Sequence, residues 1–263
     1  MIPRPVKEKL FFVTMTAFLL WAIVDAITTH RWWLLLVIYA ISSVNGIVGN
    51  NIALHRYFSH GGFKTTRWKE ILLAWWSVLP GNGMGPIAFA GLHGHHHRYS
   101  DTPRDVHSPN SHPWWYVALG LWILDSNREQ VTWTRAEKRL LKDPVLKFIE
   151  NNYFLIWIVL GSVTTWLFGW EIALYGLLAP AGYWVIQGNL VTNFLGHYPI
   201  TPGAYKTFDN KDNSTNNKFI NWLTWGEGMQ NNHHRKPAQY DHAMSPGEFD
   251  PSGWVVKKFF AVE

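Results

Sequence analysis

Long apolar runs alternate along the chain with polar segments that are rich in histidine. A helix needs about 20 apolar residues to cross the hydrocarbon core of a membrane. Four runs come close to this length, at residues 10–29, 32–54, 153–168 and 172–190. The pattern predicts an all-α integral membrane protein with four transmembrane helices, forming one domain over residues 1–263.

A fifth apolar run, at residues 71–91, is interrupted by two prolines and three glycines. Such interruptions are typical of interfacial or re-entrant segments. If this run crossed the membrane, the histidines before and after it would lie on opposite faces and could not share a metal. We therefore expect it to lie at the cytoplasmic interface.

Charge supports this topology. Charged residues make up 16% of the chain, against about 25% in soluble domains. With four spans, 22 of the 23 Lys and Arg residues fall on one side, and only Arg31 falls on the other. Because cytoplasmic loops accumulate Lys and Arg, both termini and all histidine clusters should be cytoplasmic. The basic face also suits an anionic carrier or an acidic electron donor, although topology alone explains the excess equally well. A nucleic-acid partner is not expected.

The chain has no cysteine and 13 histidines. The absence of cysteine excludes disulfides and any cysteine-ligated iron–sulfur cluster within the chain. Imidazoles are therefore the obvious metal ligands.

The first histidine cluster is His55 and His60, at the cytoplasmic end of the second span. Two histidines five residues apart are weak evidence of a metal site. Their position strengthens the hypothesis, because the glycines at 61 and 62 end the helix and a fraying helix end can turn both rings toward one point.

The second cluster is more specific. His93, His96 and His97 stand at i, i+3 and i+4, which places three imidazoles on one face of a helix; His95 points elsewhere. Packing several imidazoles together without a metal would be unfavourable, because they repel when protonated.

The third cluster repeats this spacing with Gln230 in the first position, followed by His233 and His234. A fourth contribution is expected from Asn193 and His197, which are four residues apart at the end of the last span.

The segments HRYFSH, HGHHHRYSD with the following Asp105-Val-His107-Ser-Pro, and NNKFINWLTWGEGMQNNHH resemble the membrane acyl-lipid and acyl-CoA Δ9 desaturase family, from about Asn50 to Trp254. The resemblance implies a four-helix membrane stalk with a cytoplasmic helical cap that carries two irons. It implies that the ligands are His55, His60, His93, His96, His97, His197, His233 and His234. It also implies that Asn193 reaches one metal through water.

Two positions depart from the family pattern. Gln230 stands where the family usually has histidine, and Val106 where it usually has proline. The second change should alter only a turn. The first replaces a nitrogen donor with an amide oxygen, which is a harder and weaker ligand. Gln230 keeps the helical position and could bind a metal directly or through water; the alternatives are a weakened second iron site or an inactive relative.

Function follows from the same resemblance. It implies an oxygen-dependent di-iron enzyme that introduces a cis double bond, at the Δ9 position, into a saturated acyl chain carried on CoA, a carrier protein or a lipid. The chain has no cysteine cluster, no dinucleotide-binding glycine fingerprint and no haem domain. An external electron donor, of ferredoxin or cytochrome b5 type, is therefore required.

Supporting roles are expected for acidic and histidine residues near the clusters. Asp101, Asp105, His107 and Glu227 could orient ligand imidazoles by accepting their second N–H. Ordinary structural roles are expected for His30, His112 and His242, and Asp25 is expected to snorkel toward the interface.

Three alternatives stay open. A membrane di-iron hydroxylase of a lipid or hydrocarbon would use the same histidines. A zinc hydrolase would use imidazoles to activate water, but needs fewer ligands than the eight available. A metal-binding transporter would need polar residues within its spans, and apart from Asp25 these have almost none.

Overall fold

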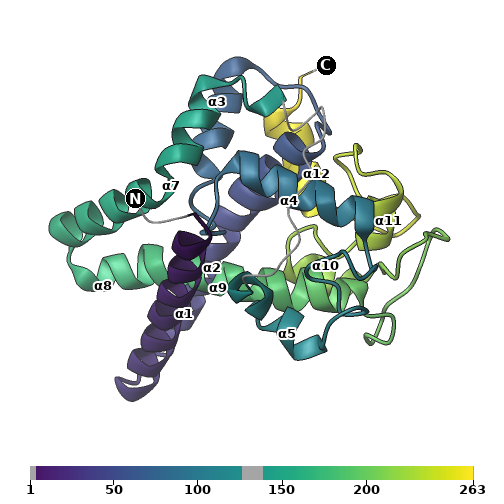
Figure 1. Ribbon diagram of the computed structural model, residues 1–263. Helices are drawn as coiled ribbons and strands as arrows, with labels where there is room; N and C mark the ends of the chain where they lie inside the picture. The colour runs from purple at the N-terminus through teal and green to yellow at the C-terminus, as the bar shows by residue number, and fades with distance from the viewer. Residues whose placement is uncertain (1–3, 126–138, 263) are drawn as a thin grey trace.

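In the computed structural model, which describes residues 4–125 and 139–262, the chain is built from helices joined by turns. Within these residues there is no β-strand, and extended segments pair only through isolated bridges at Asn216. Figure 1 shows long helices projecting on the left and shorter helices, α10 and α11, on the right. The all-α expectation is confirmed.

Two long helices begin the chain. Helix α1 (Arg4–Thr28) is followed by a short turn and by α2 (Trp33–Asn45), which continues into the π-helical η1 (Gly46–Ser59). They cover the first two predicted spans and extend the second by one turn. Gly61 has a φ of +59°, a conformation that glycine adopts at little cost. It ends this helix directly after His60.

An ion-pair cluster lies at the end of these helices remote from the histidines. Arg31 contacts Asp25 at 2.8 Å and Glu171 at 3.0 Å, and the hydroxyl of Tyr175 donates to Asp25 at 2.5 Å. The turn after α1 is thereby tied to the helical run that begins at residue 170. Asp25 was expected to snorkel toward the interface. In the structure its carboxylate is paired with Arg31 and Tyr175.

The predicted interfacial segment, residues 71–91, is divided between two helices. α3 (Arg67–Trp76) ends before a stretch of turns at 77–85, and α4 (Pro86–Tyr99) begins at a proline in its first turn. Proline suits this position because it lacks only an N–H that would otherwise be unpaired. The three histidines of the second cluster therefore lie in the last two turns of α4.

A helical hairpin follows the undescribed residues 126–138. α7 (Pro144–Phe168) is capped by Asp143, whose side chain accepts from the backbone N–H of Val145 at 2.8 Å. After Gly169, an unbroken helical run comprises α8 (Trp170–Ala173), η3 (Leu174–Leu178), α9 (Ala179–Gln187) and η4 (Gly188–Phe194), and the 3-10 turn η5 (Leu195–His197) follows it.

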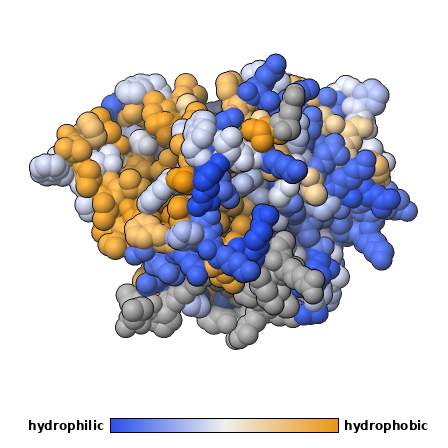
Figure 2. Space-filling view, turned by 90° about the horizontal axis from the view of Figure 1, so that it is seen from above, coloured by the Kyte–Doolittle hydropathy of each residue, from blue (hydrophilic) through white to orange (hydrophobic). Residues whose placement is uncertain are grey.

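Among the described residues, three helical segments are long and apolar enough to cross a membrane, at 5–28, 33–59 and 144–168. The helical run from residue 170 to 194 is divided between α-helical and π-helical stretches and holds the fourth predicted span. Figure 2 shows hydrophobic side chains gathered on the side of α7 and α8 and hydrophilic ones on the opposite side. α7 exposes several large apolar residues, among them Ile158 and Trp166.

The remaining elements complete the histidine-bearing part of the molecule. They are α5 (Trp114–Ala118), η2 (Leu121–Leu124), α10 (Lys218–Leu223), α11 (Gln230–Arg235), α12 (Pro251–Val255) and η6 (Val256–Phe260). One apolar core joins residues of α1, η1, α3, α4, α7 and η6. This core holds η1 and α4 together, and so places the first and second histidine clusters side by side.

A close approach within the membrane-facing part gives a first prediction. A Cβ atom at Gly46 would lie 1.9 Å from the ring of Trp184, and Trp184 is buried. Gly46→Ala should therefore destabilise the protein by about 1–3 kcal/mol through overpacking, seen as a lower Tm in detergent. The matched control is Gly161→Ala, where the nearest atom to the new Cβ lies at 3.8 Å. Equal Tm values for the two variants would contradict the prediction.

Candidate metal centre

Five histidines from three segments converge on one point, and we call them the first histidine group. They are His55 and His60 at the end of η1, His93 and His97 on α4, and His233 on α11. The Nε2 atom of His233 lies 2.8 Å from the Nε2 atoms of both His55 and His97. The Nε2 atom of His93 lies 2.7 Å from that of His60 and 3.0 Å from that of His97.

These separations fit ligands of one metal ion. Two nitrogen ligands at right angles, with metal–nitrogen bonds of about 2.1 Å, lie about 3 Å apart. Only neutral imidazole offers a lone pair to a metal. Burial lowers the pKa well below its usual value for four of the five, and neighbouring histidines lower it further; these four are His60, His93, His97 and His233. These four imidazoles are therefore neutral and able to bind a metal at neutral pH.

Three further histidines form the second histidine group: His96 on α4, His197 in η5 and His234 on α11. Their ring centroids are 4.7–5.1 Å apart. The ring of His234 lies 4.4 Å from that of His97 in the first group. The two groups are therefore adjacent, as a pair of metal ions would require.

Each histidine of the second group has a carboxylate at its Nδ1 atom. The partners are Asp105 for His96 at 2.9 Å, Asp101 for His197 at 3.2 Å and Asp212 for His234 at 2.9 Å. A carboxylate at Nδ1 holds the proton there and leaves Nε2 to bind a metal. The Nε2 atom of His234 is buried and has no hydrogen-bond partner within the described part of the chain. A metal ion would satisfy this atom.

The three carboxylates also supply negative charge. Burial opposes their ionisation, but hydrogen bonds and attraction to the histidines outweigh it, so the pKa of each lies well below its usual value. Three anions thus adjoin the imidazoles of the second histidine group. They would compensate the charge of a bound cation, which a set of imidazoles alone would not.

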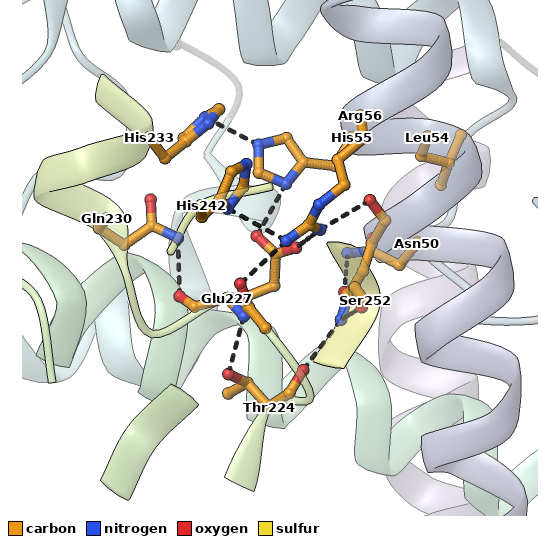
Figure 3. Close-up of polar contacts among 12 residues, drawn as sticks. Asn50, Leu54, His55, Arg56, Thr224, Glu227, Gln230, His233, His242 and Ser252 are labelled. Atoms are coloured by element: carbon orange, nitrogen blue, oxygen red, sulfur yellow. Dashed lines mark hydrogen bonds and ion pairs between the residues drawn. The ribbon is translucent and has the colours of Figure 1, made fainter. Parts of the chain in front are cut away.

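The carboxylate of Glu227 contacts His55 of the first histidine group (Figure 3). It lies 2.7 Å from the Nδ1 atom of His55 and accepts a short hydrogen bond from Arg56. Arg56 also donates to Asp250 at 3.0 Å and to the Nδ1 atom of His242 at 3.1 Å. All five side chains are buried. The orientation of the His55 ring is thus fixed by a buried network of charged and polar groups.

The two amide residues singled out in the sequence border the same site. Gln230 and Asn193 line a cavity together with His96 and His197. The side-chain nitrogen of Gln230 donates to the backbone oxygen of Glu227 at 2.8 Å, and that of Asn193 donates to Asn189 at 3.2 Å. Because these contacts use the amide nitrogens, the carboxamide oxygens are the atoms that each residue offers to a metal or a water.

Other histidines lie outside both groups. His107 is buried, with its Nδ1 atom 3.6 Å from Asp105, and it lines the cavity beside His96. His95 contacts the backbone oxygen of Arg104 at 3.0 Å, and His112 that of Asp105 at 3.1 Å. His30 occupies the turn between α1 and α2 with a φ of 56°. His107 thus lies next to the expected ligand His96, with 4.5 Å between the ring centroids, whereas His30, His95 and His112 belong to neither histidine group.

Four residues of the site were missed in the sequence: Arg56, Asp212, His242 and Asp250. His242 is fully buried, and its ring lies 4.6 Å from that of His233, but it belongs to neither histidine group. Asp212, His242 and Asp250 do not stand three or four residues from a ligand, and Arg56, which stands four residues before His60, has a guanidinium that cannot bind a metal. A buried Arg needs anionic partners, but sequence alone does not show that Arg56 is buried.

The cavity that borders the histidines is also lined by apolar side chains, including Phe89, Leu92, Trp122 and Val185. These belong to α4, η2 and α9. A space lined by both metal-binding groups and apolar side chains suits a largely apolar substrate.

Comparison with known proteins supports the same class of protein. Residues 10–245 match the model of the fatty acid desaturase family. An sn-1 stearoyl-lipid 9-desaturase from Anabaena variabilis is 31% identical over 81% of this chain and 76% of the relative. A hex-5-enoyl-[acyl-carrier protein] acetylenase from Moorena producens is 32% identical over 82% of this chain and 74% of the relative. An acyl-CoA C20 Δ5-desaturase from Anemone leveillei is 29% identical over 88% and 72%.

The family match covers most of the chain, and it includes every segment that contributes to the two histidine groups. The expectation drawn from the histidine motifs is confirmed: the chain belongs to the fatty acid desaturase family.

Proposed function

We propose that this protein is an oxygen-dependent fatty acyl desaturase that uses two irons to introduce a cis double bond, at the Δ9 position, into a saturated acyl chain. Family membership makes it an oxidoreductase that acts on acyl chains. The observation that carries the finer proposal is the pair of adjacent histidine groups, five and three imidazoles, beside a cavity that is lined in part by apolar side chains. The Δ9 position is supported by the stearoyl-lipid 9-desaturase among the relatives.

One iron would be held by the first histidine group and the other by the second group with the oxygen of Gln230, Asn193 acting through water. Imidazole is a suitable ligand for iron. When bound, the two irons supply the activation of oxygen that removal of hydrogen from an unactivated C–H bond requires, because no side chain can do this alone. Asp101, Asp105, Asp212 and Glu227 hold the ligand rings in place through Nδ1.

The protein would select the carbons that react by fixing the position of the acyl chain. An acyl chain held in the cavity would pass the histidines at a fixed depth, because the walls come from α4, η2 and α9. Fixing the reacting carbons beside the reactive centre supplies much of the rate enhancement in such enzymes. The apolar walls also exclude bulk water from the reacting carbons.

The proposed topology has four spans, with both termini and the histidine groups on the cytoplasmic side. The run from residue 170 to 194 would be the fourth span, since it returns from the Arg31–Glu171 cluster to His197. Arg31 is the single Lys or Arg at that remote end in this scheme, and cytoplasmic loops carry the excess of these residues.

The proposed partners are an acyl donor and a reductant. The relatives' names include lipid-linked, carrier-protein-linked and CoA-linked acyl groups. The proposed acyl donor of this protein is therefore an acyl lipid, an acyl-carrier protein or an acyl-CoA. Electrons would come from an acidic ferredoxin or cytochrome b5-type protein, because the chain has no cysteine for a cluster of its own and carries a net charge of +5.

Expression in a host that makes no unsaturated fatty acids tests the function directly. A desaturase yields products lighter by two hydrogens, whereas the alternative hydroxylase yields products heavier by one oxygen. A His96→Ala, His97→Ala variant measures the host background. If iron and a donor are supplied and no new unsaturated product forms, the proposal is overturned; the position of the double bond tests Δ9.

Gln230 gives a prediction about metal content. If its amide oxygen completes the second site, the purified wild-type protein should hold two irons per chain, and Gln230→His should hold the same number. Iron per protein, measured by plasma emission against amino-acid analysis, decides this. A rise from one iron to two in Gln230→His would show that glutamine leaves the second site incomplete.

A further inference from the structure

Two adjacent asparagines lie in the first turn of α11, and neither is a metal ligand in the proposed function. Asn231 and Asn232 directly precede the ligands His233 and His234, and both asparagine side chains are fully buried. A carboxamide has two N–H donors and an acceptor oxygen, and buried groups of this kind need hydrogen-bond partners. The partners of each asparagine show which segment of the chain it holds against α11.

Asn231 holds a loop of residues 207–214, which we call the carboxylate loop. The Oδ1 atom of Asn231 accepts from the backbone N–H groups of Thr207 at 2.9 Å and Phe208 at 2.8 Å. Its Nδ2 atom donates to the backbone oxygens of Phe208 at 3.0 Å and Ser214 at 3.3 Å. One buried side chain therefore binds both ends of the loop.

The carboxylate loop contacts the second histidine group in two ways. Its Asp212 lies 2.9 Å from the Nδ1 atom of His234. The backbone N–H of Asn213 donates to the Oδ2 atom of Asp101 at 2.7 Å, and the same oxygen lies 3.2 Å from the Nδ1 atom of His197. The loop thus supplies one of the three carboxylates of this group and contacts a second.

Asn232 is bonded as fully as Asn231 but holds a different segment. Its Nδ2 atom donates to the backbone oxygen of His242 and to the carboxylate of Glu248, both at 2.8 Å. Its Oδ1 atom accepts from Asn216 at 2.8 Å. The ring of His242 lies 4.6 Å from that of His233, so the segment that Asn232 holds borders the first histidine group.

We propose that Asn231 is a positioning residue for the second metal site, because it fixes the carboxylate loop and thereby places Asp212 and Asp101 against their histidines. The inference rests on the proposed function in that the second histidine group holds a metal. Loss of the Asn231 side chain would remove four hydrogen bonds to the loop. The carboxylates would then orient the imidazoles less well, and the affinity of the site for a cation would fall.

Titration of metal-free Asn231→Ala with cobalt(II), below its unfolding temperature, measures the effect on each site. The ion of the second histidine group, identified as the one that Asp212→Asn weakens, should bind about 10–100-fold more weakly than in wild type. The ion of the first group should bind as in wild type. Asn232→Ala is the matched control, because Asn232 is equally buried in the same turn; it should lower the Tm as well but leave the ion of the second group unchanged. Asn231→Ser, which keeps a smaller polar group, should show a smaller loss at the same ion and serves if the alanine variant does not fold.

A double variant separates positioning from a general loss of stability. Asp212→Asn should weaken the ion of the second group less in the Asn231→Ala background than in wild type, because residues of one network have non-additive effects. Trypsin should also cleave after the exposed Lys206, next to the loop, faster in metal-free Asn231→Ala than in Asn232→Ala.

Equal losses at this ion in Asn231→Ala and Asn232→Ala would overturn the inference, and so would fully additive effects of Asn231→Ala and Asp212→Asn. These outcomes are read from metal binding and do not depend on catalysis. A selective loss of the second-group ion, in a protein that forms no unsaturated product in the host test, would support the inference while overturning the proposed function.

Discussion

Arg56→Leu is expected to destabilise the protein by about 3–5 kcal/mol, the cost of removing one partner from a buried charged network. The Arg56 side chain is 1% exposed and contacts both Glu227 and Asp250, which are themselves buried. Leucine would leave these two carboxylates without a cation and would leave the backbone oxygens of Asn51 and Gly226 without a donor. The loss is measured as a lower Tm of the metal-free protein in detergent.

Arg31→Leu is the matched control, because Arg31 also contacts two carboxylates but at the exposed end of the helices. Exposed ion pairs contribute little to stability, so this variant should unfold close to the wild-type temperature. Equal effects of the two substitutions would contradict the view that burial, rather than the ion pair itself, makes Arg56 important.

Metal binding should also separate the two arginines. Arg56 holds Glu227, and Glu227 fixes the ring of His55 in the first histidine group. Below the temperature at which Arg56→Leu unfolds, it should bind its first metal more weakly than wild type does, whereas Arg31→Leu should bind it equally well. This comparison distinguishes a positioning role from a general loss of folding.

The three histidine clusters were visible in the sequence, but their division between two groups was not. Helical spacing predicted that His93, His96 and His97 share one face. The structure places His93 and His97 in the first group and His96 in the second. His233 and His234 divide in the same way. A helix that packs between two metal sites directs neighbouring residues to different sites. Segments that are distant in the sequence determine which residue joins which site.

The long helices were predicted well for a related reason. Their apolar composition is a property of a continuous segment, so residues 10–29 and 32–54 were assigned without knowledge of the rest of the chain. The carboxylate of Asp212 reaches His234 across 22 positions, and Arg56 reaches Asp250 across 194. Such contacts depend on the packing of elements that have no local sequence relationship.

Asp212→Asn is expected to weaken metal binding by the second histidine group by 10–100-fold, the usual effect of losing an outer partner of a ligand histidine. Asp212 lies 2.9 Å from the Nδ1 atom of His234. Asp212 accepts from His234 through Oδ2 and from the hydroxyl of Ser214 through Oδ1. Asparagine keeps one acceptor oxygen, which can serve His234, but it removes the negative charge that compensates the cation. The effect should therefore be electrostatic, with the fold retained.

Titration of the metal-free protein with cobalt(II), followed by its visible absorption, measures the two sites separately. Wild type should bind two ions, and Asp212→Asn should retain the affinity of one and lose that of the other. Asp209→Asn, in the same loop but exposed, should match wild type. Glu227→Gln should instead weaken the site of the first group, because Glu227 contacts His55. If Asp212→Asn and Glu227→Gln weakened the same ion, the assignment of the histidines to two separate metal sites would be wrong.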